Sequence, residues 1–341
     1  MIRAAASRLR FLGRATRVCA ICGGISISLG AAPAANRIHL SPKFVSGETL
    51  RYQIDTKTVT TGKATSPIAD PEAASKFNQS ANLIVRLEVL DVKPELDGSA
   101  SRVRLRATYE KSSATSESDS YDAGAAALQE QYDKLQGRSL QFTIEPDGKV
   151  TSVAGFDDLL SNPSAASSMQ AWMDGLSSSA KFPKEGIEVG QKWTNDRPLE
   201  NTPLAGLTFH TESTYLRNEP CPGESGAVTP DAGGSACATI LTKFEIFRHG
   251  SAHGDATPDS YLHNGLRTSG TWTGAGESLD SVSLANGMVV RSTQTGKQDM
   301  DFSIVSAASG SKMHYSGHVD SRSEISLLPP RLSGDAPALK P

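Results

Sequence analysis

The sequence predicts a mainly β protein made of two repeated antiparallel curved sheets with a few helices packed on them. Segments with strand-type alternation of apolar and polar residues recur along the chain. A 14-residue pattern occurs twice, at an offset of 139 residues. The composition agrees, because 38% hydrophobic and 6% aromatic residues with abundant Ser, Thr and Gly suit short strands and polar connections.

Residues 1–34 have the pattern of a secretory signal peptide. The first 17 residues contain five arginines and no acid, an apolar run extends from Val18 to Leu29, and small residues follow. Cleavage after Ala34 fits the small residues at Ala32 and Ala34. The run is shorter than the roughly 20 residues that span a bilayer. We therefore expect a periplasmic or extracellular protein with no transmembrane segment after cleavage.

The charge of the remaining chain argues against nucleic acid and anionic lipid headgroups as partners. Removal of residues 1–34 lowers the basic count from 34 to 29 against 37 acidic residues, a net charge of about −8. Nucleic acid and anionic lipid headgroups would be repelled. We expect no nucleic-acid partner.

Residues 35–155 are predicted to form the first β half. Leu50, Tyr52 and Ile54 share one face of a strand, and the segment 102–109 alternates three arginines with four apolar residues. That arginine row fits the solvated outer face of a sheet, with anion binding as the alternative. Residues 122–137 predict a helix, with Asp122 as N-cap and Gly137 as its end.

Residues 156–182 are predicted to be a helical linker, and residues 183–328 the second β half. Met169, Trp172 and Met173 lie at helical spacing, which is typical of a packing face. The stretch PKEGIEVGQKWTND, residues 183–196, follows. Its glycines indicate turns and Trp193 indicates core packing at the start of an extended segment. Residues 329–341 are expected to be a disordered tail.

The internal repeat carries the two-half prediction. Residues 137–150 (GRSLQFTIEPDGKV) and residues 276–289 (GESLDSVSLANGMV) share Gly-x-Ser-Leu, six residues, Asp or Asn, Gly, x, Val. The Asp147-Gly148 and Asn286-Gly287 dipeptides favour tight turns, so each copy predicts a hairpin. The strand starts GETL at Gly47 and GLTF at Gly206 form a shorter match.

Cys221 and Cys237 are the cysteines that remain after the predicted cleavage. In an exported protein they are expected to form a disulfide that closes a loop rich in Gly, Pro and Ser. A reactive thiol pair is the alternative, but neither cysteine has a basic neighbour that would lower its pKa.

The segments VGQKW, residues 189–193, and LQFTIEPDGKVTSVAG, residues 140–155, with the export signal, resemble a family of uncharacterised secreted or lipid-anchored bacterial proteins, a domain of unknown function. That family is in turn distantly similar to the half-barrel carriers of lipids and lipoproteins in the bacterial envelope. The resemblance covers most of residues 40–328 and implies a half-barrel-like fold. It supplies no catalytic residues, and the lipid-attachment cysteine of anchored members is absent.

The segment HGSAHGDATPDSYLH holds the weak candidates for a metal site: His249, His253, Asp255 and His263. Its spacing matches no helical metal motif, and a polar surface loop is the competing interpretation. His314 and His318 can share one face of a strand but have no evident third ligand. No nucleophile elbow, zinc-protease motif, phosphate loop or dinucleotide fingerprint occurs.

These observations favour an exported envelope binding or carrier protein, non-catalytic, for a lipid or other apolar ligand or an envelope protein, with no cofactor expected. A metal-dependent or serine hydrolase is one alternative. A structural or assembly component of the envelope, which would pair strands with a partner, is the other.

Overall fold

The computed structural model describes residues 37–65, 75–94, 101–119, 123–146, 149–155, 182–199, 202, 204, 206–222, 235–248, 262–263, 266–306 and 308–329. Residues Asn36–Pro341 form one compact unit. The predicted signal peptide, most of the predicted linker and nearly all of the predicted tail lie outside the described residues. Within those residues, no helix is both long and apolar enough to cross a membrane.

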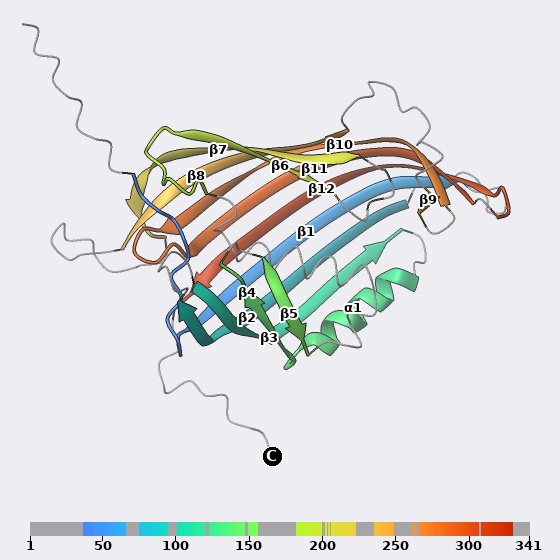
Figure 1. Ribbon diagram of the computed structural model, residues 1–341. Coiled ribbons are helices and arrows are strands. Elements are labelled where there is room, and N and C mark those ends of the chain that lie inside the picture. Colours follow the sequence, from blue (N-terminus) through green and yellow to red (C-terminus); the bar gives the residue numbers. More distant parts are fainter. Residues whose placement is uncertain are drawn as a thin grey trace, which may run out of the picture. The chain divides into compact units, whose positions relative to one another are not determined.

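Twelve strands and one helix make up the described structure (Figure 1). The first group is β1 Thr49–Thr65, β2 Ser75–Pro94, β3 Ser101–Ser118, α1 Ala123–Leu135, β4 Ser139–Ile144 and β5 Val150–Ala154. The second group is β6 Lys192–Pro198, β7 Leu207–Pro220, β8 Ala236–Arg248, β9 Leu262–His263, β10 Leu266–Ser283, β11 Val289–Ser306 and β12 Lys312–Leu328.

The described strands form one antiparallel sheet in the order β5-β4-β3-β2-β1-β12-β11-β10-β8-β7-β6, with β9 paired to β10. The mainly antiparallel β class is therefore confirmed, but there is one sheet where the sequence predicted two. The physical reason is the pairing of β1 with β12, from Arg51 with Leu328 to Thr65 with His314. Backbone hydrogen bonds between these strands join the two groups in the middle of the sheet.

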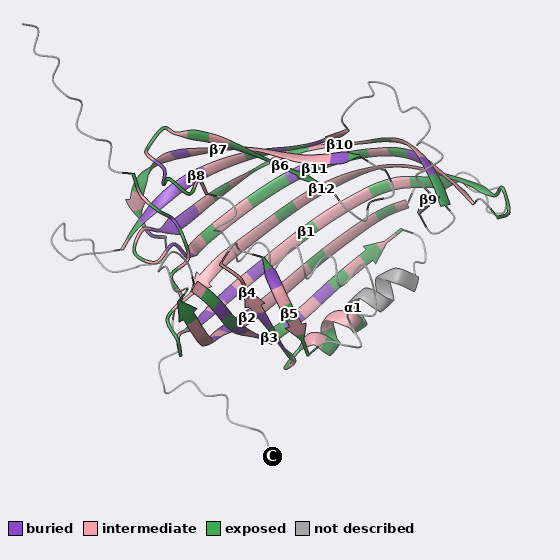
Figure 2. Ribbon diagram, viewed as in Figure 1, coloured by how far each residue is buried: buried purple, intermediate pink, exposed green. Residues whose placement is uncertain are grey.

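Strict alternation explains the faces of the sheet. On β3, Val103, Leu105, Ala107 and Tyr109 are buried, while the arginines between them are less buried (Figure 2). Leu50, Tyr52 and Ile54 are buried on β1 in the same way, so both predicted strand faces are confirmed. We call the side that bears these residues the apolar face and the opposite side the polar face.

All three hydrophobic clusters lie on the apolar face. The first cluster joins β1 to β5 and reaches β12 at Ile325, which is opposite Ile54. Tyr315, ten residues earlier on β12, has the same orientation and belongs to the cluster that spans β7, β8, β10, β11 and β12. Ile240 on β8 continues that face into the remaining cluster. One open sheet therefore carries its apolar side chains on one side.

Helix α1 agrees with the prediction for residues 122–137. It contacts β3 and lies beside that strand (Figure 1), and Leu135 packs against the first cluster. The chain leaves the helix through Gly137, whose φ of 79° lies in the left-handed region that glycine adopts without strain.

Both copies of the internal repeat form hairpins. In the first copy, the Glu145 N–H donates to the Lys149 carbonyl between β4 and β5 (2.8 Å), and in the second the Ser283 N–H donates to the Met288 carbonyl between β10 and β11 (2.9 Å). Their surroundings differ, because β5 is an edge strand whereas β10 and β11 have neighbours on both sides. The local prediction is right, but the copies do not occupy equivalent places in two like sheets.

The stretch at residues 183–196 is structural, as expected. Gly186 and Gly190 have positive φ values, and Ile187 forms a β-bridge with Ile38. Trp193 lies on β6 and packs against Phe182, with ring centroids 6.0 Å apart, beside the cluster that contains Ile187. The partly buried tryptophan therefore packs against the core.

Candidate functional site

Five aromatic side chains gather on the apolar face of β7, β8, β10, β11 and β12. We call this set the aromatic platform; its members are Phe209, Phe244, Trp272, Phe302 and Tyr315. The rings of Phe209 and Phe244 stack with centroids 5.2 Å apart, and those of Phe302 and Tyr315 lie 5.3 Å apart. Phe209, Trp272 and Tyr315 are only partly buried.

Glycines in the strands allow two of these rings to lie close to the sheet. A Cβ atom at Gly276 would lie 2.4 Å from Cζ of Phe244, and one at Gly296 would lie 2.9 Å from the same atom. A Cβ atom at Gly317 would lie 2.7 Å from Oη of Tyr315. Because a side chain at these positions would displace the rings, the glycines form the floor of the platform.

A glycine inside a strand often marks a bulge, but Gly317 on β12 does not form one. Gly317 pairs in regular register with Gly62 on β1, with no shift along the β1–β12 pair. Its role is to make room for Tyr315, which lies two residues away on the same face.

One polar contact holds the orientation of the tryptophan in the platform. The Nε1–H of Trp272 donates to Oε1 of Gln298 on β11 over 3.1 Å. A tryptophan fixed through its polar edge leaves the apolar face of the ring available for contact.

The polar face of β1, β2 and β3 is held together by ion pairs. Glu110 binds Arg51 over 2.7 Å and Arg86 over 3.4 Å, and Glu88 binds Arg86 over 3.1 Å. The predicted arginine row lies on this face, where Arg102 pairs with Glu145 over 2.7 Å. The solvated-face interpretation of that row is the one the contacts support.

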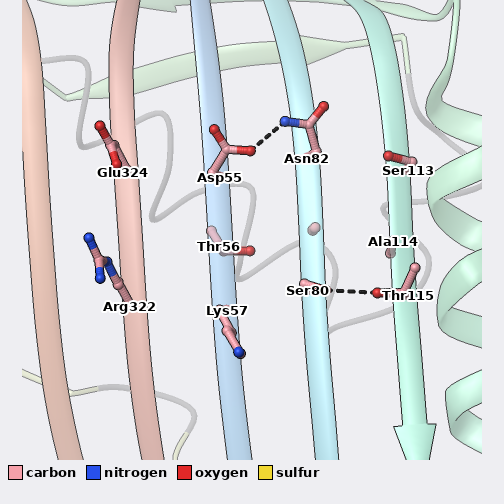
Figure 3. Close-up of a pocket in the computed structure, with 11 residues that line it drawn as sticks. Asp55, Thr56, Lys57, Ser80, Asn82, Ser113, Ala114, Thr115, Arg322 and Glu324 are labelled. Carbon is pink, nitrogen blue, oxygen red and sulfur yellow. Dashed lines mark hydrogen bonds between the residues drawn. The ribbon is translucent and has the colours of Figure 1, made fainter.

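Two shallow hollows lie on the polar face. The larger, of about 370 Å³, spans β12, β1, β2 and β3, and Figure 3 shows its lining. The other, of about 350 Å³, lies beside Leu279 and Arg291. Neither of these two hollows is on the apolar face.

His314 and His318 share the polar face of β12, as predicted, and carboxylates of β11 face them. His318 Nδ1 lies 2.8 Å from Asp299 Oδ1 and its Nε2 lies 3.2 Å from Asp320 Oδ2. His314 Nε2 lies 3.6 Å from Asp301 Oδ1. The hydrogen bond to Asp299 raises the pKa of His318, and the charge of Asp320 adds to this. Each histidine thus faces a carboxylate of β11 on the polar face.

His249, His253 and Asp255 of the predicted metal loop lie outside the described residues. The backbone of His263 lies in β9, opposite Leu266 of β10. Among the residues that are described, no group of three or more His, Cys, Asp or Glu side chains is placed to hold a metal ion.

Cys221 and Cys237 form the expected disulfide. Cys237 lies on β8 opposite Glu219 of β7, and the Cys221 N–H donates to the Ser235 carbonyl over 3.0 Å. The bond therefore links the ends of two paired strands. A disulfide is compatible with an exported protein.

The first cluster contains two buried tyrosines, Tyr52 and Tyr109. Desolvation raises the pKa of Tyr52 and of Tyr109 well above the usual value of a tyrosine. Both side chains pack among aliphatic residues of β1, β2 and β3 and stay protonated. They serve the core of the sheet.

Neither the platform nor the larger hollow was found from the sequence. One sequence feature could have indicated the platform, namely glycines inside strand-type segments, where glycine indicates close approach of another group. These glycines are Gly274, Gly276, Gly296 and Gly317. No sequence feature indicates the hollow, because only the β1–β12 pairing places Lys57 opposite Arg322.

Comparisons with known proteins give no family for this chain. No family model matches it, and no curated protein matches it. A solved structure, "Lipid-protein interactions in lipovitellin", matches with a TM-score of 0.42 and 11% identity over 86% of this chain and 27% of that chain. DynF from the dynemicin biosynthesis pathway of Micromonospora chersina matches with a TM-score of 0.17 and 8% identity over 86% and 85% of the two chains.

This chain thus spans about a quarter of the length of the lipovitellin chain. Both TM-scores are below 0.5, so we draw no functional conclusion from these likenesses. The family resemblance stated from the sequence stays an expectation.

Proposed function

We propose that this chain is an exported carrier that binds an apolar ligand, such as a lipid chain, on the aromatic platform. The observation that carries the proposal is the platform itself: large aromatic side chains gathered on the apolar face of one sheet, three of them only partly buried. Such side chains supply most of the binding energy of apolar ligand sites.

The floor of the platform supports this proposal. Phe244 and Tyr315 lie close to the backbone because Gly276, Gly296 and Gly317 carry no side chains. A ring close to the backbone of a sheet forms part of the apolar surface of that face. A flexible hydrocarbon can contact several such rings at once, and each fully buried ring contributes about 1.5–3 kcal/mol.

The proposal is tested by titrating the purified protein with a fluorescent fatty acid, cis-parinaric acid. We expect saturable binding, and we expect Phe209→Ala and Trp272→Ala each to weaken it about tenfold or more. Leu279→Ala is the matched control, since Leu279 is 43% exposed but lies on the polar face. Its binding should equal that of the wild type.

Two results would count against a carrier. One is the absence of saturable binding, and the other is an equal loss of affinity in the Leu279 control. Circular dichroism of each variant shows whether the fold is kept, and lipid extraction of the native protein followed by mass spectrometry identifies a co-purified ligand.

The assembly alternative has less support at the β6 edge of the sheet. β6 is an edge strand that contains Lys192, Asp196, Arg197 and Pro198. Charges and proline on an edge discourage pairing with another strand. The hydrolase alternative depends on the loop that contains His249, which lies outside the described residues.

A further inference from the structure

The larger hollow on the polar face contains two rows of side chains that cross four strands. In Figure 3 both rows run from β12 through β1 and β2 to β3. Strand register places the members of each row opposite one another. One row is Glu324, Asp55, Asn82 and Ser113. The other row is Arg322, Lys57, Ser80 and Thr115.

Each row begins with two like charges on neighbouring strands. Asp55 is directly opposite Glu324, and Lys57 is directly opposite Arg322. Directly opposed side chains have Cβ atoms about 4.5–5.5 Å apart, and like charges in such pairs are destabilising. A compensating group therefore stabilises each pair.

The acidic pair has its compensation within the protein. Glu324 binds Arg291 over 2.6 Å. Asp55 accepts hydrogen bonds from the side-chain amides of Gln53 (2.7 Å) and Asn82. The neighbouring Asp320 is likewise matched, because Lys297 lies 3.6 Å and His318 lies 3.2 Å from it.

The basic pair has no such compensation in the part of the chain that the structure describes. No carboxylate there lies within ion-pair distance of Lys57 or Arg322. The same strand β1 offers a direct comparison, since Arg51 is opposite Arg86 and Glu110 binds both of them, over 2.7 and 3.4 Å. At Arg51, Glu110 supplies the bridging anion; at Lys57, no carboxylate of the described residues lies within ion-pair distance.

We infer that the hollow binds a small polar ligand through an oxyanion, a phosphate or carboxylate group, held between Lys57 and Arg322. Two cations on adjacent strands can contact one oxyanion together, and guanidinium and ammonium groups are the side chains that bind such groups best. The hydroxyls of Ser80 and Thr115, which share a hydrogen bond of 2.7 Å, extend the donor row. The volume of about 370 Å³ accommodates a small molecule.

This site is separate from the proposed carrier function. Lys57 and Arg322 project from the polar face, whereas the aromatic platform lies on the apolar face of the same sheet. The two sites can therefore be tested independently, and the failure of one proposal leaves the other standing.

The experiment titrates the full exported chain with inorganic phosphate, and separately with acetate, at low ionic strength. Binding is followed by isothermal calorimetry and by the rise in melting temperature. We expect saturable binding of at least one of the two anions, lost at least tenfold in Lys57→Ala and in Arg322→Ala. Preference for phosphate indicates a phosphorylated ligand, and preference for acetate indicates a carboxylate ligand.

Lys63→Ala is the matched control, because Lys63 is an exposed lysine on the same face of β1, six residues from Lys57. It should bind the anion as the wild type does. Without anion, the melting temperature of Lys57→Ala should be no lower than that of the wild type, because the change removes a repulsion. A loss of anion binding in this variant is then not caused by unfolding. Absence of saturable binding to the wild type, or an equal loss in Lys63→Ala, overturns the inference.

Discussion

Gly276 has no side chain, and this allows the ring of Phe244 to pack close to the strand on the apolar face. A Cβ atom there would lie 2.2 Å from the Thr295 carbonyl oxygen and 2.4 Å from the ring of Phe244. Alanine would therefore force both the strand pair and the ring to move.

Substitution of Gly276 by alanine is expected to lower the free energy of unfolding by about 1–3 kcal/mol, the usual cost of overpacking. Urea unfolding measures this change. Ala275→Val serves as the control, because Ala275 is exposed on the polar face of the same strand. Equal stability of Gly276→Ala and wild type would show that the ring does not depend on this glycine.

His318 contributes a pH dependence to the stability of the sheet. Because its pKa is raised in the folded protein, protonation favours the fold. The stabilisation is complete below the unfolded pKa of about 6.5 and is lost as the pH rises through the raised value.

Asp299→Asn is expected to lower the pKa of His318, because it removes the hydrogen-bonded carboxylate. An NMR titration of the imidazole protons measures the value directly. Asp301→Asn, which removes the carboxylate beside His314, should change the pKa of His318 less. The reverse order of effects would contradict the assignment.

At the scale of elements, the β7–β8 pair depends on a covalent link. The disulfide joins residues 16 apart in sequence, and a closed loop of this length contributes about 3 kcal/mol by restricting the unfolded chain. Simultaneous Cys221→Ser and Cys237→Ser substitution should lower the free energy of unfolding by about that amount. Urea unfolding tests this, with the reduced wild type as the comparison; an unchanged midpoint would exclude a stabilising role.

At the scale of the whole molecule, the β1–β12 pair decides whether the sheet behaves as one unit. The two strands come from opposite ends of the described chain, so this pairing has high contact order and should form late in folding. The division of the sequence into halves at residues 35–155 and 183–328 stays a proposal. The continuous sheet contains strands from both of these halves.

Ile325→Ala is expected to destabilise both sides of the sheet together, by about 1–3 kcal/mol, since Ile325 packs against the first cluster across the β1–β12 pair. Hydrogen exchange measured by mass spectrometry should show β2–β3 and β10–β11 losing protection in one step. Val59→Ala, on the polar face of β1, is the control. Separate loss of protection on the two sides would indicate two independently folding halves.

The sequence alone determined the local features of this protein. Alternation placed Tyr52 and Leu105 on buried strand faces, the Asn286-Gly287 dipeptide located a hairpin, and two cysteines indicated a disulfide. The strand faces and the hairpin depend on residues close together in the chain. The disulfide was predictable because two cysteines allow a single pairing. Periodicity therefore sufficed for the secondary structure and for the mainly β class.

Only the tertiary structure decided which strands are neighbours, and with that the candidate sites. Backbone hydrogen bonds are the same for every residue type, so alternation shows which side of a strand is buried but does not identify its partner. Strand register over long sequence separations places Lys57 opposite Arg322. It also places Phe244 beside Gly276 and Gly296. One sheet in place of two has the same cause, because β12 pairs with β1.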